Sequence, residues 1–149
     1  MVINKRLWTM SLLLLVLTAG CASMSQDKMA DKSLYDRLGG KDAITAVVDD
    51  FVGRVAADNR INGFFAKANV PRLKMMLVDQ ICEASGGPCK YTGRDMKTAH
   101  RGMGITDAAF DALVGDLVAT LDKFKVGERE KQELLGALGP MRKDIVEKP

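Results

Sequence analysis

The stretch YTGRDMKTAHRGMGI, residues 91–105, contains His100, which is the only histidine in the chain. Gly93 is placed to open a short helix over residues 94–101, and the glycines that follow are placed to end it. Met96 and His100 are four residues apart, so they lie on the same face of this helix. The segment therefore presents one imidazole and one thioether together.

Two chemical roles fit a lone histidine in this setting. Gly102 and Gly104 allow a close approach on one side and Ile105 follows as an apolar plug, so His100 suits an axial ligand to a flat metallated ring. The alternative is a core histidine bonded to a backbone carbonyl, and the segment by itself favours that role. A zinc site is not expected, because the chain has no second histidine and no Cys-x-x-Cys pair.

The composition is that of one small globular domain. The 149 residues are 47% hydrophobic, 28% charged and only 5% aromatic. The formal net charge is +3, and setting aside the two leader cations Lys5 and Arg6 leaves about +1. A balance so close to neutral gives no indication of a nucleic-acid partner, and we expect none.

Residues 1–20 have the pattern of a secretory signal peptide: two basic residues, an apolar run too short to span a bilayer, and then small residues. Residues 17–21, LTAGC, resemble a bacterial lipobox, in which Cys21 is lipidated and becomes the first mature residue. Thr18 stands where leucine is more usual, so ordinary signal-peptide cleavage stays an alternative. Ala22, rather than an aspartate, follows the cysteine, which favours the outer membrane.

The polar residues 21–32 fit a tether from the lipidated Cys21, and the folded domain is expected over residues 33–149. Apolar residues at spacings of three and four predict helices and no strand in this domain, so the class is all-α. The predicted helices cover residues 33–38, 41–57, 71–84, 94–101, 107–124 after an N-cap at Thr106, and 128–146 with a kink at Gly139-Pro140. The predicted inner face of the third helix is Leu73, Met76, Leu77, Gln80 and Ile81.

Cys82 and Cys89 flank the turn Gly86-Gly87-Pro88, which can return the chain to the ~5.5 Å Cα separation of a disulfide. Outside the cytoplasm cysteines are oxidised where geometry allows, so we expect this disulfide rather than two reduced buried thiols. It would fix the approach between the helix over residues 71–84 and the arm that carries His100. The pair is not a c-type haem attachment, because no Cys-x-x-Cys-His sequence is present.

From residue 33 to about residue 146 the chain resembles a group I truncated haemoglobin. The resemblance rests on motifs that occur together, in order and spacing: SLYDRLGG, VVDDF, the Phe64-Phe65 pair, RLK after a proline, GGP followed by YTGRDM, and AHRGMGIT. It implies a truncated globin fold, a two-over-two helical sandwich around haem b (iron protoporphyrin IX).

Residue by residue, the resemblance implies that His100 is the proximal iron ligand, and this role then outweighs that of a core histidine. Phe65, the second of its pair, matches the phenylalanine that stacks on the haem. Further positions match haem- or tunnel-lining residues but also suit an ordinary core, and for Phe110 and Val114 the two roles are equally well supported. These positions are Phe51, Leu73, Ile81, Met96, Ile105, Phe110 and Val114.

Two departures from the family concern the distal side. Many members have a tyrosine where this chain has Val52 and a glutamine where it has Leu77, and both side chains donate hydrogen bonds to bound dioxygen. Bound dioxygen is partly negative, so such bonds are among the stronger kinds, and their loss predicts fast dioxygen release and easy oxidation to ferric haem. Gln80 is placed either to supply a replacement amide or to face water at the pocket edge.

Met76 stands where some relatives have a histidine that closes onto the iron as a sixth ligand. A thioether there would give a His100–Met76 site with a raised reduction potential. The simpler expectation is that Met76 fills space beside the ring. Several basic residues are candidates for the haem propionates and equally for ordinary solvated surface: Arg72, Lys74, Arg94 and Lys97.

Together these features predict a haem protein, tethered to the periplasmic side of a bacterial membrane, that reversibly binds oxygen, nitric oxide or carbon monoxide at iron ligated by His100. We expect a binding protein rather than an enzyme. Nitric oxide dioxygenase chemistry needs a stable dioxygen complex, and peroxidase chemistry needs a distal acid–base group that the sequence does not offer. The alternatives are an electron-transfer role through Met76, with an unknown reductase, and a structural lipoprotein that has lost haem.

Overall fold

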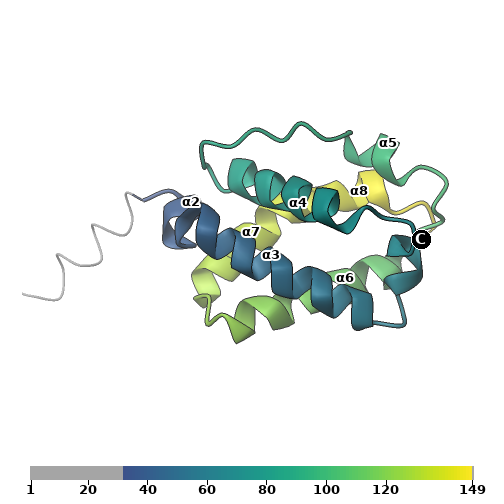
Figure 1. The fold of residues 1–149 in the computed structure, drawn as a ribbon, viewed down its shortest axis with the longest axis horizontal. Coiled ribbons are helices and arrows are strands. Elements are labelled where there is room, and N and C mark those ends of the chain that lie inside the picture. The colour runs from purple at the N-terminus through teal and green to yellow at the C-terminus, as the bar shows by residue number, and fades with distance from the viewer. Residues whose placement is uncertain (1–31, 149) are drawn as a thin grey trace, which may run out of the picture. The chain divides into compact units, whose positions relative to one another are not determined.

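The computed structural model describes residues 32–148 (Figure 1). Apart from one isolated bridge, their regular elements are all helical, as predicted: α2 (Leu34–Arg37), α3 (Gly40–Ala57), the 3-10 helix η1 (Asn62–Phe65), α4 (Val70–Ala84), α5 (Met96–His100), α6 (Asp107–Lys123), α7 (Glu128–Leu138), the 3-10 helix η2 (Gly139–Met141) and α8 (Arg142–Ile145). The predicted signal peptide, Cys21 and nearly all of the tether lie outside the described residues. Within residues 32–148, no helix is long and apolar enough to span a bilayer.

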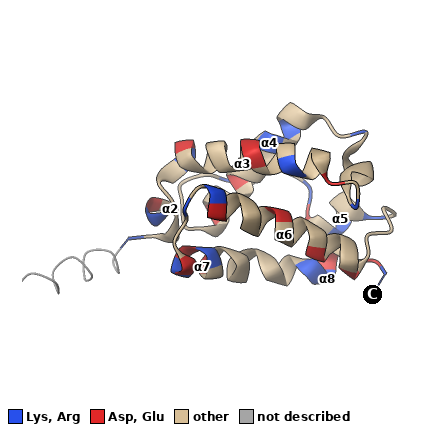
Figure 2. Cartoon of the chain, turned by 90° about the horizontal axis from the view of Figure 1, so that it is seen from below, with Lys and Arg blue, Asp and Glu red and all other residues tan. Residues whose placement is uncertain are grey.

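Two layers of helices make up the domain (Figures 1 and 2). α3 packs against α4 beside it and against α6 in the other layer, while α7 packs against α4 and α2. The short α5 lies at the far end from α2 and packs against α8. This is the two-over-two arrangement that the sequence implied.

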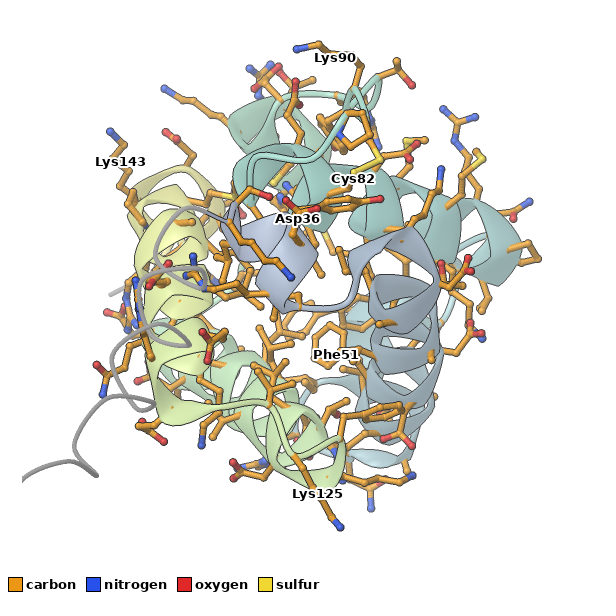
Figure 3. The ribbon with its side chains drawn as sticks, turned by 90° about the vertical axis from the view of Figure 1, so that its left-hand side faces the viewer. Asp36, Phe51, Cys82, Lys90, Lys125 and Lys143 are labelled. Atoms are coloured by element: carbon orange, nitrogen blue, oxygen red, sulfur yellow. A yellow bond between two sulfur atoms is a disulfide. The ribbon has the colours of Figure 1, made fainter. Side chains whose placement is uncertain are left out.

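The core between the layers is apolar. Phe51 points from α3 into this core (Figure 3) and is 7% exposed, while Leu121 of α6 and Leu134 of α7 are each 1% exposed. Because α3 meets neighbours on two sides, its buried stripe is wide. The buried residues of α3 are those that its spacing predicted: Ile44, Val47, Val48, Phe51, Val52 and Val55.

α4 has two apolar faces rather than the single inner face that was predicted. Val78, Ile81 and Cys82 are its buried residues, on the side that meets α3 and α7. Of the predicted inner face, Ile81 is fully buried and Leu77 packs against the core while half-buried, and the fully buried stripe is rotated toward Val78 and Cys82. The half-buried residues are Leu73, Met76, Leu77 and Gln80.

α5 begins later than predicted, because Asp95 rather than Gly93 opens it. The Asp95 carboxylate accepts the N–H of Thr98 at 2.8 Å and so caps the first turn. Gly93 lies in the preceding loop, where a Cβ would clash with the hydroxyl group of Tyr91 as it now stands. At the other end of the chain, the predicted kink divides the last helix into α7, η2 and α8 around Pro140.

The predicted disulfide joins Cys82 to Cys89 with a Cα–Cα separation of 5.7 Å (Figure 3 labels Cys82). Gly87 makes this close turn possible, since a Cβ there would lie 2.7 Å from the Cys82 Sγ and 2.5 Å from the Tyr35 ring. The bond ties the last turn of α4 to the segment that leads to α5. The disulfide therefore links this helix to the arm that carries His100, as the sequence predicted.

Asp116 is a buried carboxyl on α6 whose hydrogen bonding is incomplete. The residue is 8% exposed, and its Oδ2 has no hydrogen-bond partner among the described residues. Burial, followed by the negative charge of Asp58, raises the pKa of Asp116 above the usual range for aspartate. The neutral form is therefore favoured by the fold.

Replacing Asp116 by asparagine should stabilise the protein at neutral pH. A carboxyl whose pKa is raised by folding destabilises the folded state as the pH rises toward that pKa. The stability gained by removing this carboxyl should therefore be absent below about pH 3.9, the usual pKa of aspartate, and should grow above it. A gain of about 1 kcal/mol, the lower end of the penalty for an unsatisfied buried polar group, corresponds to roughly 4 °C in Tm. Thermal unfolding of Asp116→Asn and the parent across this range measures it; a pH-independent shift would contradict the argument.

Candidate functional site

His100 is the last residue of α5 and is half-buried. Its Nδ1 lies 2.7 Å from the carbonyl oxygen of Met96, one turn earlier. A carbonyl oxygen can only accept, so Nδ1 carries the hydrogen and the neutral ring keeps its lone pair on Nε2. The carbonyl contact that a core histidine requires is thus present, but it also sets the tautomer and orientation that a metal ligand requires.

The loop after His100 depends on its glycines. Gly102 and Gly104 have φ values of +77° and +66°, in the left-handed region that favours glycine. The N–H of Met103 donates to the His100 carbonyl oxygen at 3.1 Å, and Ile105 closes the loop as a residue only 8% exposed. As predicted, the helix ends before the two glycines, and the apolar residue after them, Ile105, is buried.

Gln80 is engaged by two sulfur atoms. Its Nε2 lies 3.4 Å from the Sδ of Met96 and 3.5 Å from the Sδ of Met141. Thioether sulfur can accept a hydrogen bond, although weakly, so these two contacts give the amide N–H groups their partners. Gln80 therefore connects α4 to α5 and η2 through these two contacts.

The predicted lining residues fall into two sets. Phe51, Val52 and Ile81 belong to the main core, and Phe65 and Leu77 pack against it while half-buried. The structure thus brings together side chains from α3, η1 and α4 in one apolar wall.

The second set lies outside that core cluster. Phe110 on α6 is buried beneath Arg142 of α8, whose guanidinium carbon is 4.9 Å from the ring centroid. Ile105 is buried as well. The half-buried members of this set are Leu73, Met76, Met96 and Val114.

The donor chemistry of the site fits haem. Among residues 32–148, no three His, Cys, Asp or Glu side chains converge on a point where they could hold a metal ion. A single imidazole does not hold a bare ion, but it would suffice for haem iron, because the macrocycle would supply further ligands of its own. The half-buried side chains of Leu73, Met76 and Leu77 on α4 are apolar, as contacts to a flat apolar ring would require.

The basic residues considered for the propionates differ in their environments. Lys74 forms an ion pair with Asp49 of α3 at 2.9 Å. The side chains of Arg72, Arg94 and Lys97 are exposed. These three remain candidates, whereas Lys74 already contributes to the contact between α3 and α4.

Comparison with known proteins decides the family. The model of the bacterial-like globin family matches residues 33–147. The chain is 41% identical over 118 residues to a group 1 truncated haemoglobin of Mycolicibacterium paratuberculosis, an alignment that covers 79% of this chain and 87% of that protein. The chain belongs to the group 1 truncated haemoglobins.

Solved structures of truncated haemoglobins agree with the fold. The Fe(III) form of the protein from Tetrahymena pyriformis is 32% identical with a TM-score of 0.74, over 77% of this chain and 98% of that one. A 2/2 haemoglobin from a Synechococcus species, in the cyanomet state with covalently attached haem, is 34% identical with a TM-score of 0.74, over 78% of this chain and 100% of that one. Such relatives imply haem as the cofactor of a truncated haemoglobin.

One contact in this truncated haemoglobin has no counterpart in the sequence prediction. The carboxylate of Glu147 accepts the backbone N–H groups of Gly102 and Gly104, each at 2.6 Å. The partners are 45 and 43 residues apart, and no local period or motif indicates a pairing over that distance. The paired glycines of the loop were the only signal that its N–H groups needed partners.

Proposed function

We propose that this truncated haemoglobin binds haem b through His100 and that the haem iron would reversibly bind a diatomic ligand: oxygen, nitric oxide or carbon monoxide. The observation that carries the proposal is the 2.7 Å contact between His100 Nδ1 and the Met96 carbonyl oxygen. It leaves Nε2 as the one nitrogen of the neutral ring with a free lone pair. The family and the apolar wall beside α4 support the same assignment.

Haem, when bound, supplies the iron to which the gas coordinates; the chain supplies orientation and an apolar environment. The Met96 carbonyl sets the rotation of the His100 ring, and Asp95 holds the turn in which both lie. The aromatic ring of Phe65 and the side chain of Ile81 provide apolar contact area from η1 and α4. An apolar environment of this kind favours neutral ligands over charged ones.

The distal side lacks hydrogen-bond donors at the two positions where family members provide them. Val52 is 8% exposed and Leu77 packs against the core, and both are aliphatic. Gln80, the nearest amide on α4, is held by the sulfur atoms of Met96 and Met141. These observations favour a site that releases dioxygen quickly, and hence a binding function over nitric oxide dioxygenase chemistry.

We also propose that the protein is exported and held at the membrane by lipid on Cys21, facing the periplasm. The lipobox-like residues 17–21 support this, and a Cys82–Cys89 disulfide fits an oxidising compartment. Incorporation of labelled fatty acid into the parent, but not into Cys21→Ala, tests the anchor. Equal labelling of the two proteins would refute it.

The optical spectrum of the purified, haem-loaded protein tests the proposed function. We expect a Soret band, a five-coordinate high-spin ferrous form after dithionite, and a large shift on adding carbon monoxide. A low-spin ferrous form that becomes high-spin in Met76→Ala would instead favour the electron-transfer role. A protein that folds to a fully helical state and shows no Soret band would refute haem binding.

A further inference from the structure

The C-terminal segment runs beside the loop that follows α5. In Figure 1 the yellow chain end after α8 lies next to the green loop between α5 and α6. The N–H groups of Glu147 and Lys148 donate to the Ile105 carbonyl oxygen at 2.9 and 3.1 Å, and Lys148 forms an isolated parallel bridge with Thr106. Glu147 and Lys148 are thus attached to residues that follow His100 by five and six positions.

The Glu147 side chain extends this attachment to the glycines themselves. Its two carboxylate oxygens each accept one backbone N–H, from Gly102 and Gly104, at 2.6 Å. The left-handed conformation of both glycines directs these N–H groups to the same side, and a carboxylate forms stronger hydrogen bonds to them than a neutral acceptor would. The two bonds hold the pKa of Glu147 below its usual range.

The helix that carries His100 has little means of holding itself in place. α5 contains only five residues, and so short a helix is not stable without contacts from its surroundings. Asp95 caps its beginning, and the residues after its end are held by Glu147. Since His100 is the last residue of α5, the Glu147 bonds act on the end where the imidazole lies.

We propose that Glu147 is a positioning residue for the proximal histidine: by fixing the loop over residues 102–105 it sets the orientation of His100 toward haem iron and slows haem loss. The inference rests on the proposed function, because it requires His100 to be the ligand. Groups that orient metal-bound histidines typically change metal affinity by about 10- to 100-fold when removed. Glu147 acts through the backbone rather than on the ring itself, so we expect the lower end of that range.

The variants Glu147→Gln and Asp144→Asn separate this role from a general effect of charge. The glutamine keeps the shape of Glu147 but can offer only one oxygen to the two N–H donors. Asp144 lies three residues earlier on α8, is exposed, and has no hydrogen bond or ion pair among the described residues. Glu147 is also exposed, so its replacement opens no cavity.

Two measurements on the haem-loaded protein are decisive. Transfer of haem to excess apomyoglobin should be about 10-fold faster for Glu147→Gln, and within about twofold of the parent for Asp144→Asn. The Fe–His stretching band in resonance Raman spectra of the ferrous protein should shift or broaden only in Glu147→Gln. Equal behaviour of Glu147→Gln and the parent in both measurements would overturn the proposal, as would equal effects of the two substitutions.

Further controls distinguish a failure of this inference from a failure of the proposed function. Amide hydrogen exchange in the haem-free protein should be faster at Gly102 and Gly104 in Glu147→Gln, with the Tm nearly unchanged; uniformly faster exchange would indicate general destabilisation and overturn the role. If His100→Gly keeps haem as the parent does, the ligand assignment itself is wrong. If His100 is required and Glu147→Gln has no effect, only the positioning role is wrong.

Discussion

Haem should dissociate from His100→Gly at least ~100-fold faster than from the parent protein. Removing a residue that merely orients a metal-bound histidine costs up to about 100-fold in affinity, and removing the ligand itself should cost no less. Among residues 32–148 no other histidine is available to replace it, and no carboxylate or cysteine cluster converges nearby. Transfer of haem to excess apomyoglobin, followed in the Soret band, measures the effect.

Free imidazole provides the matched control for this substitution. Glycine leaves space at the end of α5 for an imidazole molecule, which should restore both the spectrum and slow haem loss if His100 acts as the ligand. A variant that loses haem and regains nothing with imidazole would indicate that His100 serves the fold instead. A variant that retains haem as the parent does would contradict the assignment outright.

The elements that could be predicted are those specified by local sequence. Apolar residues recur along α3 at spacings of three and four, which places them on one face of the helix. This spacing predicts the buried stripe of α3, which includes Val48 and Phe51. The Cys82–Cys89 disulfide follows from the turn Gly86-Gly87-Pro88, which lies between two cysteines seven positions apart. Thr106 caps α6 as predicted, because its hydroxyl accepts the N–H of Ala109 at 3.1 Å.

Contacts between distant segments could not be predicted in the same way. α4 is apolar on two adjacent faces, so periodicity alone does not say whether Val78 or Met76 faces the core; the positions of α3 and α7 decide that. For Gln80, the sulfur atoms that engage it come from α5 and η2. The Glu147 contact likewise exists only because α8 ends beside the loop after His100.

These differences bear on how the proximal and distal sides are constructed. Around the proposed iron ligand the polar groups are engaged: the His100 Nδ1 by a carbonyl, and the N–H groups of Gly102 and Gly104 by Glu147. At the positions proposed for the distal side, the side chains of Val52 and Leu77 offer no polar atom. We infer a site in which the histidine proposed to bind the iron is closely constrained, and in which the gas is retained only by its bond to the iron.

Introducing a donor on the distal side should therefore have a large effect, and Leu77→Gln is the simplest such change. A hydrogen bond to a charged partner contributes about 1.5–3 kcal/mol, which corresponds to dioxygen dissociation slower by roughly 10- to 150-fold. Glutamine is close to leucine in size, and Leu77 is only half-buried, so the fold should tolerate the amide. Stopped-flow replacement of dioxygen by carbon monoxide measures the rate.

Leu77→Met separates the hydrogen bond from the change of shape. It alters the side chain without adding a donor, so its dioxygen dissociation rate should stay within about threefold of the parent, below the change expected for one hydrogen bond. Carbon monoxide provides a second control, because it carries little charge when bound and its dissociation should hardly change in either variant. Equal slowing in Leu77→Gln and Leu77→Met would point to steric trapping. An unchanged rate in Leu77→Gln would mean that residue 77 does not face the ligand. The proposal that Val52 and Leu77 line the distal side would then be wrong.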